Sequence, residues 1–252
     1  MTDSRLASVA DVVCAASAPA LPTLSIVIPV LNEGATLTIR LAALNALRQR
    51  GAQIVVVDGG SQDDSVAVAE AHADHVLAAP AGRASQMNAG AAACQSDLLL
   101  FLHADTLLPD AADQLIREAL ADPHVWGRFD VRFDSERALL HTVAGAMNRR
   151  SRFTGIATGD QAMFMRRGAF DAVGGFPQIA LMEDIELSRR LKRLSRPACL
   201  RAQVVTSARR WQQHGAWRTI GLMWGLRAAY FVGVDPARLQ RWYRAPGQGR
   251  RS

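Results

Sequence analysis

Residues 24–33, LSIVIPVLNE, decide the fold, because a continuous apolar run ends there directly in a polar turn. Residues 53–61, QIVVVDGGS, and residues 98–106, LLLFLHADT, repeat the same arrangement. Apolar runs of this length, bounded by turn residues, are typical of strands buried on both faces of a sheet. These three segments therefore predict the buried centre of an α/β sheet.

Segments with helical spacing alternate with these strands. We expect a helix at 36–50 closed by Gly51, a helix capped by Ser61, a short strand at 74–79, a small-residue helix at 82–94, a strand at 97–103 and a helix at 109–121. This alternation predicts a mainly parallel sheet with right-handed crossovers, about 100 residues long.

The second half of the chain has a different pattern. Residues 125–133, VWGRFDVRF, alternate between apolar residues on one face and Arg128, Asp130 and Arg132 on the other. We expect an antiparallel strand with one solvated face. A helix at 138–149, a Gly-rich turn with a strand, a turn at 170–177 and a helix at 183–194 follow.

The composition is that of an ordinary globular protein, with 252 residues, 49% hydrophobic and 21% charged. Three cysteines without a CxxC motif support neither a disulfide framework nor a zinc cluster, and they indicate a reducing, cytoplasmic compartment. No uncharged apolar run reaches 18 residues, so no transmembrane helix is predicted. Asp11 interrupts the apolar N-terminal segment, so we interpret residues 1–22 as a flexible extension.

The basic charge is concentrated at the C-terminal end. Residues 189–252 carry fifteen basic residues and one acid, whereas residues 1–188 carry 14 bases and 22 acids. This asymmetry suggests an anionic partner, such as a membrane surface, a diphosphate or nucleic acid. A solvated, arginine-rich surface is the alternative interpretation.

Polar residues stand where the predicted strands end, and ligands of parallel sheets bind at those ends. If the strand at 97–103 stays extended, alternation places His103 and Asp105 on one face. They then form a metal or phosphate site, or they simply mark a strand end turning into solvent.

The ordered set of motifs resembles inverting glycosyltransferases of family 2, which have the GT-A fold. The motifs are SIVIPVLNE, VVVDGGSQDDS, GRASQMNAG, LLFLHADT, TGDQAMFMRR and MEDIELSRRL, spread over about residues 24–210. HAD and GDQ are also similar to the bacterial subgroup associated with arsenosugar biosynthesis. The resemblance implies a catalytic domain at 23–210 and a basic, Trp-rich helical extension at 211–252.

For the donor half, the resemblance implies a nucleotide-diphosphate sugar and a divalent metal, Mg²⁺ or Mn²⁺. Asp105 matches the last Asp of the family's Asp-x-Asp motif and would bind the metal, with His103 replacing the first Asp. The nucleotide would be held by Asp58, where Gly59 replaces the family's second Asp. The other donor-binding candidates are Asn32, Glu33 and Arg83.

For the acceptor half, the resemblance assigns the general base to Asp184, with Glu183 as alternate base or orienter. Acids in a first helical turn also have a purely electrostatic explanation. The acceptor-binding candidates are Asp160, Gln161, Arg210 and Trp211, the last two in a SARRW segment similar to the family's Gln-x-x-Arg-Trp motif. The acceptor would be a small molecule or lipid-linked, with no nucleic-acid partner.

Residues 217–233 place Trp217, Ile220, Trp224 and Phe231 near one helical face. This helix packs on the catalytic domain or in a homodimer, or it contacts a membrane peripherally, on its inner surface. Two other functions remain open at this point. One is a nucleotidyltransferase on a similar sheet, and the other is a non-catalytic carrier or membrane-surface binding module.

Overall fold

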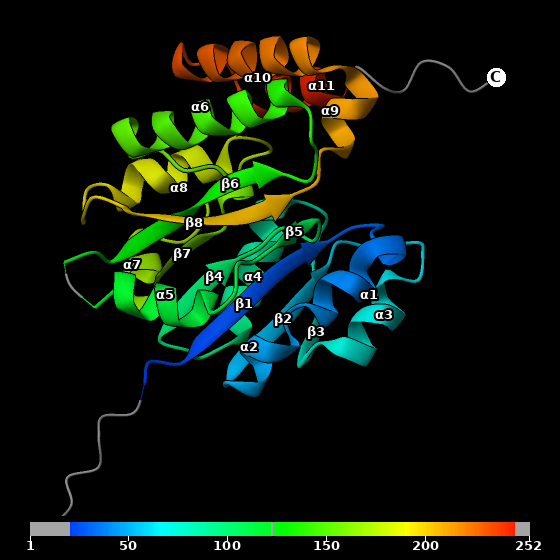
Figure 1. Cartoon of the computed structure of the whole chain (residues 1–252), viewed down its shortest axis with the longest axis vertical. Coiled ribbons are helices and arrows are strands. Elements are labelled where there is room, and N and C mark those ends of the chain that lie inside the picture. The colour runs from blue at the N-terminus through cyan, green and yellow to red at the C-terminus, as the bar shows by residue number, and fades with distance from the viewer. Residues whose placement is uncertain (1–20, 122, 245–252) are drawn as a thin grey trace, which may run out of the picture.

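The computed structural model describes residues 21–121 and 123–244 of the chain, so almost all of the predicted N-terminal extension lies outside the described residues. The described strands form one sheet in the order β3-β2-β1-β4-β7-β6-β8-β5 (Figure 1). The strands are β1 (Leu24–Val30), β2 (Ala52–Asp58), β3 (His75–Ala78), β4 (Leu98–Phe101), β5 (Thr106–Leu107), β6 (Trp126–Phe133), β7 (Met163–Arg166) and β8 (Ala198–Thr206).

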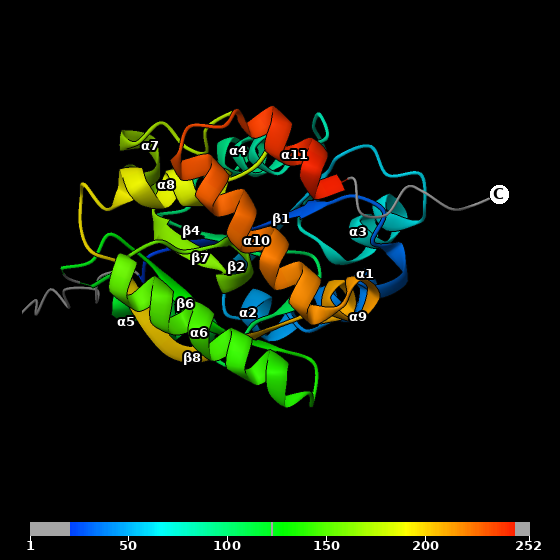
Figure 2. The ribbon, with the colours of Figure 1, turned by 90° about the horizontal axis from the view of Figure 1, so that it is seen from above.

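Helices cover both faces of this sheet (Figures 1 and 2). They are α1 (Gly34–Ala42), α2 (Asn45–Gln49), α3 (Ser65–His72), α4 (Arg83–Ala93), α5 (Ala112–Ala119), α6 (Ala138–Thr154), α7 (Arg167–Ala172), α8 (Glu183–Leu191), α9 (Arg209–His214), α10 (Ala216–Phe231) and α11 (Pro236–Arg244), with a 3₁₀ turn η1 (Gly159–Gln161).

The N-terminal half is the parallel sheet that the apolar runs predict. Strand β1 pairs in parallel with β2 on one side and β4 on the other, and β3 extends the sheet beyond β2. Along β1, Ile26 and Ile28 pack into the core on one face, whereas Val27 packs against α4 on the opposite face. A side chain at Gly90 of α4 would collide with Val27, so this small-residue helix lies close to the sheet as predicted.

Three local predictions are wrong at their boundaries. The predicted helix at 36–50 is two helices, because the chain turns at Leu44, whose N–H donates to Leu41 O at 3.0 Å. Helix α3 begins at Ser65, and Ser61 instead donates its hydroxyl to Asp58. Strand β4 ends at Phe101, and a turn closed by Thr106 N–H to His103 O at 3.0 Å replaces the extended segment expected through His103.

Strand β6 is buried on both faces except at Arg132, so the predicted solvated face is wrong at Arg128 and Asp130. It pairs antiparallel with β7 and parallel with β8, while α6 packs across it. Arg128 is fully buried and forms an ion pair with Asp130, which also binds Arg152 of α6. Arg128 and Asp130 are thus paired inside the fold, whereas Arg132 is exposed as predicted.

The C-terminal helices return over the sheet (Figure 2). Leu226 of α10 and Leu239 of α11 are buried with Ile185 of α8. Helices α10 and α11 therefore pack against the remainder of the chain. None of the described helices has the length and apolar character needed to cross a membrane.

Candidate active site

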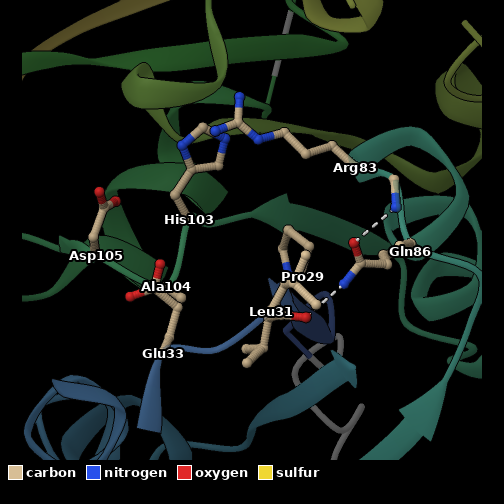
Figure 3. A pocket seen from close by; sticks show the side chains of 11 residues that line it. Pro29, Leu31, Glu33, Arg83, Gln86, His103, Ala104 and Asp105 are labelled. Carbon is tan, nitrogen blue, oxygen red and sulfur yellow. Dashed lines mark hydrogen bonds between the residues drawn. The ribbon is translucent and has the colours of Figure 1, made fainter. Parts of the chain in front are cut away.

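A pocket opens at the carboxyl ends of β1 and β4, beside the first turn of α4 (Figure 3). Its volume is about 260 Å³, and Glu33, Arg83, Gln86, His103 and Asp105 are among its lining residues. A second pocket of about 340 Å³ shares Glu33, Arg83, His103 and Asp105 with the first. The two pockets therefore form one continuous cleft, at the edge where the sequence predicts ligand binding.

The acidic corner of this cleft is formed by Glu33 and Asp105. Asp105 lies in the turn after β4, and its Oδ1 accepts a hydrogen bond from Thr106 Oγ1 at 3.2 Å. Burial raises the pKa of Glu33 above its ordinary value and Asp105 adds to this, although the Arg209 guanidinium, 3.4 Å from Glu33 Oε1, opposes it. Arg209 neutralises the charge of these two carboxylates only in part, so this corner is a suitable place for a cation.

His103 faces away from this corner. Its Nδ1 lies 3.2 Å from Asp160 Oδ1, and its ring packs against the backbone of Gly159, where a side chain would collide with it. In Figure 3 the His103 ring and the Asp105 carboxylate point in different directions. The described residues contain no group of three or more His, Cys, Asp or Glu side chains suited to hold a metal. The structure therefore does not join His103 and Asp105 in one ligand set.

Asp160 lies in η1 and lines the second pocket. Burial would raise its pKa, but the His103 hydrogen bond and the nearby charges of His103, Arg83 and Arg227 lower it to about 2. Gln161, its neighbour and predicted partner in acceptor binding, has no exposed surface. Its side chain donates to Asn148 Oδ1 at 3.3 Å and accepts from Thr158 N–H, so it holds the turn and does not reach the cleft.

The first turn of α4 is fixed to the sheet by Gln86, which the sequence analysis did not single out. Its Nε2 donates to Val30 O and Val57 O, both at 2.8 Å, and its Oε1 accepts from Gly82 N–H at 3.3 Å (Figure 3). A Cβ at Gly59 would lie 3.1 Å from this side chain. Glycine at position 59 therefore leaves room for the Gln86 side chain.

Asp58 and Asn32 stabilise the loops around the cleft and do not line either pocket. Asp58 Oδ2 accepts from the backbone N–H groups of Gly60 and Ser61, at 2.8 and 3.0 Å. Asn32 has a φ of 55°, and its Oδ1 accepts from Gln62 N–H at 2.8 Å. Both side chains are therefore engaged by loop backbone.

The acidic pair of α8 lies on the far side of η1. Asp184 Oδ2 accepts from Gly159 N–H at 2.8 Å and its Oδ1 from Ile185 N–H at 2.7 Å. Glu183 is buried and lines a neighbouring pocket with Arg83 and Tyr243. Burial and the Asp184 charge raise the pKa of Glu183 to about 7. The Asp184 carboxylate is therefore held by backbone N–H groups, whereas Glu183 is buried beside a like charge.

The C-terminal helices supply the outer wall of the cleft. Trp211 lines it and stacks edge-on against Phe133, with ring centroids 5.2 Å apart. Arg209 lines it too, although the sequence pointed to Arg210, whose side chain lies outside the described residues. The two arginines of the RRW segment indicate a positively charged side chain at this place. Only the structure shows which one lines the cleft: Arg209, the first residue of α9, faces Glu33.

Comparison with known proteins identifies the family. The family described as glycosyl transferase family 2 matches residues 25–174. The chain belongs to glycosyl transferase family 2. No curated protein sequence matches it significantly.

Several solved structures resemble this family 2 glycosyltransferase. The mannosyltransferase PcManGT from Pyrobaculum calidifontis, in complex with GDP-Man and Mn²⁺, is 19% identical with a TM-score of 0.62, over 90% of this chain and 71% of that one. S. aureus TarS 1–349, in complex with UDP-GlcNAc, is 16% identical with a TM-score of 0.60, over 73% and 58%.

Glucosyl-3-phosphoglycerate synthase from Mycobacterium tuberculosis, in complex with Mn²⁺, UDP and glucosyl-3-phosphoglycerate, is 18% identical with a TM-score of 0.52, over 73% and 71%. At these identities the likeness concerns the fold alone. It confirms the predicted GT-A architecture, an α/β sheet with helices on both faces.

Proposed function

We propose that this protein transfers a sugar from a nucleotide-diphosphate sugar to an acceptor hydroxyl, with inversion at the anomeric carbon. The observation that carries the proposal is the cleft itself, where Asp105, Glu33 and Arg83 meet at the carboxyl ends of β1 and β4 in a family 2 domain. The related structures that hold GDP-Man, UDP or UDP-GlcNAc support a nucleotide-sugar donor. The nucleotidyltransferase alternative lacks a cation in the turn after β1, where Glu33 stands.

The donor diphosphate is assigned to the acidic corner of the cleft. Hard divalent cations take carboxylate oxygens together with phosphate and water oxygens, so one available carboxylate fits such a site. Asp105 is partly exposed in the cleft and supplies that ligand. The chemistry that a bound Mg²⁺ or Mn²⁺ supplies is neutralisation of the charge on the leaving diphosphate. Arg83 provides a fixed positive charge on the other side of the first pocket.

Asp184 is assigned as the general base. The acceptor oxygen attacks the anomeric carbon, the bond from that carbon to the diphosphate breaks with its electron pair on the leaving oxygen, and the acceptor proton passes to Asp184. Two backbone N–H groups orient the Asp184 carboxylate, as a base requires. Glu183, with a pKa near 7, is the alternate base, and His103 positions Asp160 on the acceptor side.

Calorimetric titration of nucleoside diphosphates, with Mn²⁺, with Mg²⁺ and with a chelator, tests the donor site. We expect metal-dependent micromolar binding of one nucleotide, lost in Asp105→Asn and retained in Asp110→Asn, which changes an exposed acid outside the cleft. Absence of binding for every nucleotide, with or without metal, contradicts the proposal. NMR detection of the anomer of the product then tests inversion.

An exposed aromatic stripe supports peripheral contact with a membrane. Trp217, Trp224 and Phe231 recur every seven residues of α10 and keep 75%, 72% and 62% of their surfaces exposed. Exposed Arg218 beside them suits anionic headgroups. We expect the protein to sediment with phosphatidylglycerol vesicles, and Trp217→Ser/Trp224→Ser to abolish this while Phe153→Ser, at an exposed site on α6, does not.

A concentration-dependent dimer without vesicle binding would instead assign the stripe to a second copy of the chain. The narrower resemblance to the arsenosugar subgroup remains a prediction, because the family match does not test it. Identification of the acceptor would test whether the protein belongs to that subgroup.

A further inference from the structure

Arg150 of α6 carries buried hydrogen-bond donors that the described part of the chain does not satisfy. Its Nε and Nη2 atoms are shielded from solvent and have no hydrogen-bond partner. Burial, together with the positive charges of Arg227 and Arg128, lowers its pKa to about 10, although Asp184 opposes this. Arg150 as a whole is half-buried, but two buried guanidinium donors without partners are costly, so they indicate a ligand.

Arg227 of α10 is the second cation at this place. No ion pair or hydrogen bond of its side chain occurs among the described residues, although its charge acts on both Arg150 and Asp160. The third cation, Arg128, does have partners. Its two terminal nitrogens donate hydrogen bonds to Asp130 and to Asn148 O. Arg150 and Arg227 therefore form a pair of guanidinium groups with free donors.

The acids near this pair are already engaged. Asp184 accepts from two backbone N–H groups, and Asp160 binds His103. Neither carboxylate is hydrogen-bonded to Arg150 or Arg227. The positive charge of the pair is thus not matched by a direct partner within the described protein.

The charge of Arg227 acts on Asp160, which lines the second pocket, so the pair lies near this pocket without lining it. Thr219 and Met223 of α10 line the second pocket, and Arg227 continues the same helical stripe one turn further along. Helices α6 and α10, which carry the two arginines, lie on the same side of the molecule in Figures 1 and 2. Asp105 lines both pockets, and the donor corner that it forms with Glu33 lies next to the ends of β1 and β4.

We propose that Arg150 and Arg227 bind a phosphate group of the acceptor, next to the base that receives the acceptor proton. This inference rests on the proposed function, since it names the class of acceptor for the same site. A phosphate dianion matches two positive charges, and its oxygens accept hydrogen bonds from two guanidinium groups at once. The acceptor class is therefore a phosphorylated hydroxy compound rather than a neutral sugar.

The test is a calorimetric titration of inorganic phosphate into the protein saturated with its nucleoside diphosphate and Mg²⁺, at constant ionic strength. We expect submillimolar binding, weakened at least tenfold in Arg150→Gln and in Arg227→Gln. The matched controls are Arg149→Gln on α6 and Arg238→Gln on α11, both exposed, which should bind phosphate like the unmodified protein. Thermal melting checks that every variant is folded.

The outcomes separate this inference from the proposed function. Nucleotide binding without phosphate binding overturns the inference alone. Loss of nucleotide affinity in Arg150→Gln or Arg227→Gln assigns the arginines to the donor diphosphate and also overturns it. Failure of all nucleotide binding in the unmodified protein overturns the proposed function and the inference together.

Discussion

His103 Nδ1 and Asp160 Oδ1 lie 3.2 Å apart, which joins the turn after β4 to the 3₁₀ turn before β7. The two turns come from different halves of the chain, and their side chains meet in the middle of the cleft. Asp105, His103 and Asp160 thus line the same pocket, with the imidazole held by Asp160. The contact with Asp160 explains why position 103 holds a histidine, where the family's Asp-x-Asp motif has an Asp.

Replacement of Asp160 by Asn should lower stability in a pH-dependent way. The native pKa of Asp160 is lowered to about 2, so its stabilising contribution is present above its ordinary value near 4 and is lost as the pH falls toward 2. Its side chain is 41% exposed, which limits the effect to about 1 kcal/mol at pH 7. Urea unfolding should show this difference at pH 7 and a smaller one at pH 3, whereas Asp110→Asn should show neither.

Glu183 produces the opposite pH dependence. Its native pKa is raised to about 7, so the folded state holds a proton that the unfolded state releases near pH 4.5. The resulting stabilisation is complete below pH 4.5 and disappears as the pH rises through 7. Glu183→Gln should therefore gain about 3 kcal/mol over the unmodified protein between pH 4.5 and pH 8. A constant difference across this range, in melts at matched ionic strength, would contradict the assignment.

Asp184→Asn should reduce sugar transfer far more than it reduces donor binding. A missing general base lowers the chemical step by roughly 10²–10⁴-fold, while the nucleotide contacts remain. The assay measures nucleoside diphosphate release at saturating donor, beside the calorimetric Kd. Glu183→Gln is the paired comparison, and a larger loss of kcat in that variant would transfer the role of base to Glu183.

The central strands could be predicted to within a residue or two because their burial is recorded in continuous apolar runs. Val27, Val55 and Leu99 pack on one face and their neighbours on the other, so these runs are almost entirely apolar, and the buried Ser25 is hydrogen-bonded to Gln53 and Ser96. The solvated face predicted for β6 is wrong at its N-terminal end, because Arg128 finds its counter-ion in Asp130, two residues along the same strand, and only Arg132 of the three charges is exposed. Alternating charge has the same appearance whether the partner is water or another side chain.

Residues of the candidate site could be predicted where neighbouring residues in the sequence determine their position. They could not be predicted where tertiary contacts determine it. Arg83 and Asp105 lie in the cleft because each follows a strand end or opens a helix. Gln86 was missed, since its partners, Val30 O and Val57 O, belong to two strands far away in sequence. Arg227 was not singled out either, because only the path of α10 brings it near Arg150.

Arg150→Met should stabilise the fold while it removes phosphate binding. Methionine keeps most of the length of the arginine side chain but leaves no buried charge and no unsatisfied N–H group, and these are the costs that Arg150 carries. A gain of about 1 kcal/mol corresponds to a rise in Tm of about 2–4 °C for a chain of this size. Differential scanning calorimetry in phosphate-free buffer measures it. Arg149→Met, on the exposed face of the same helix, should change the Tm by less than this. If instead Arg150→Met lowered the Tm, the guanidinium would contribute to folding, and its free donors would no longer indicate a ligand.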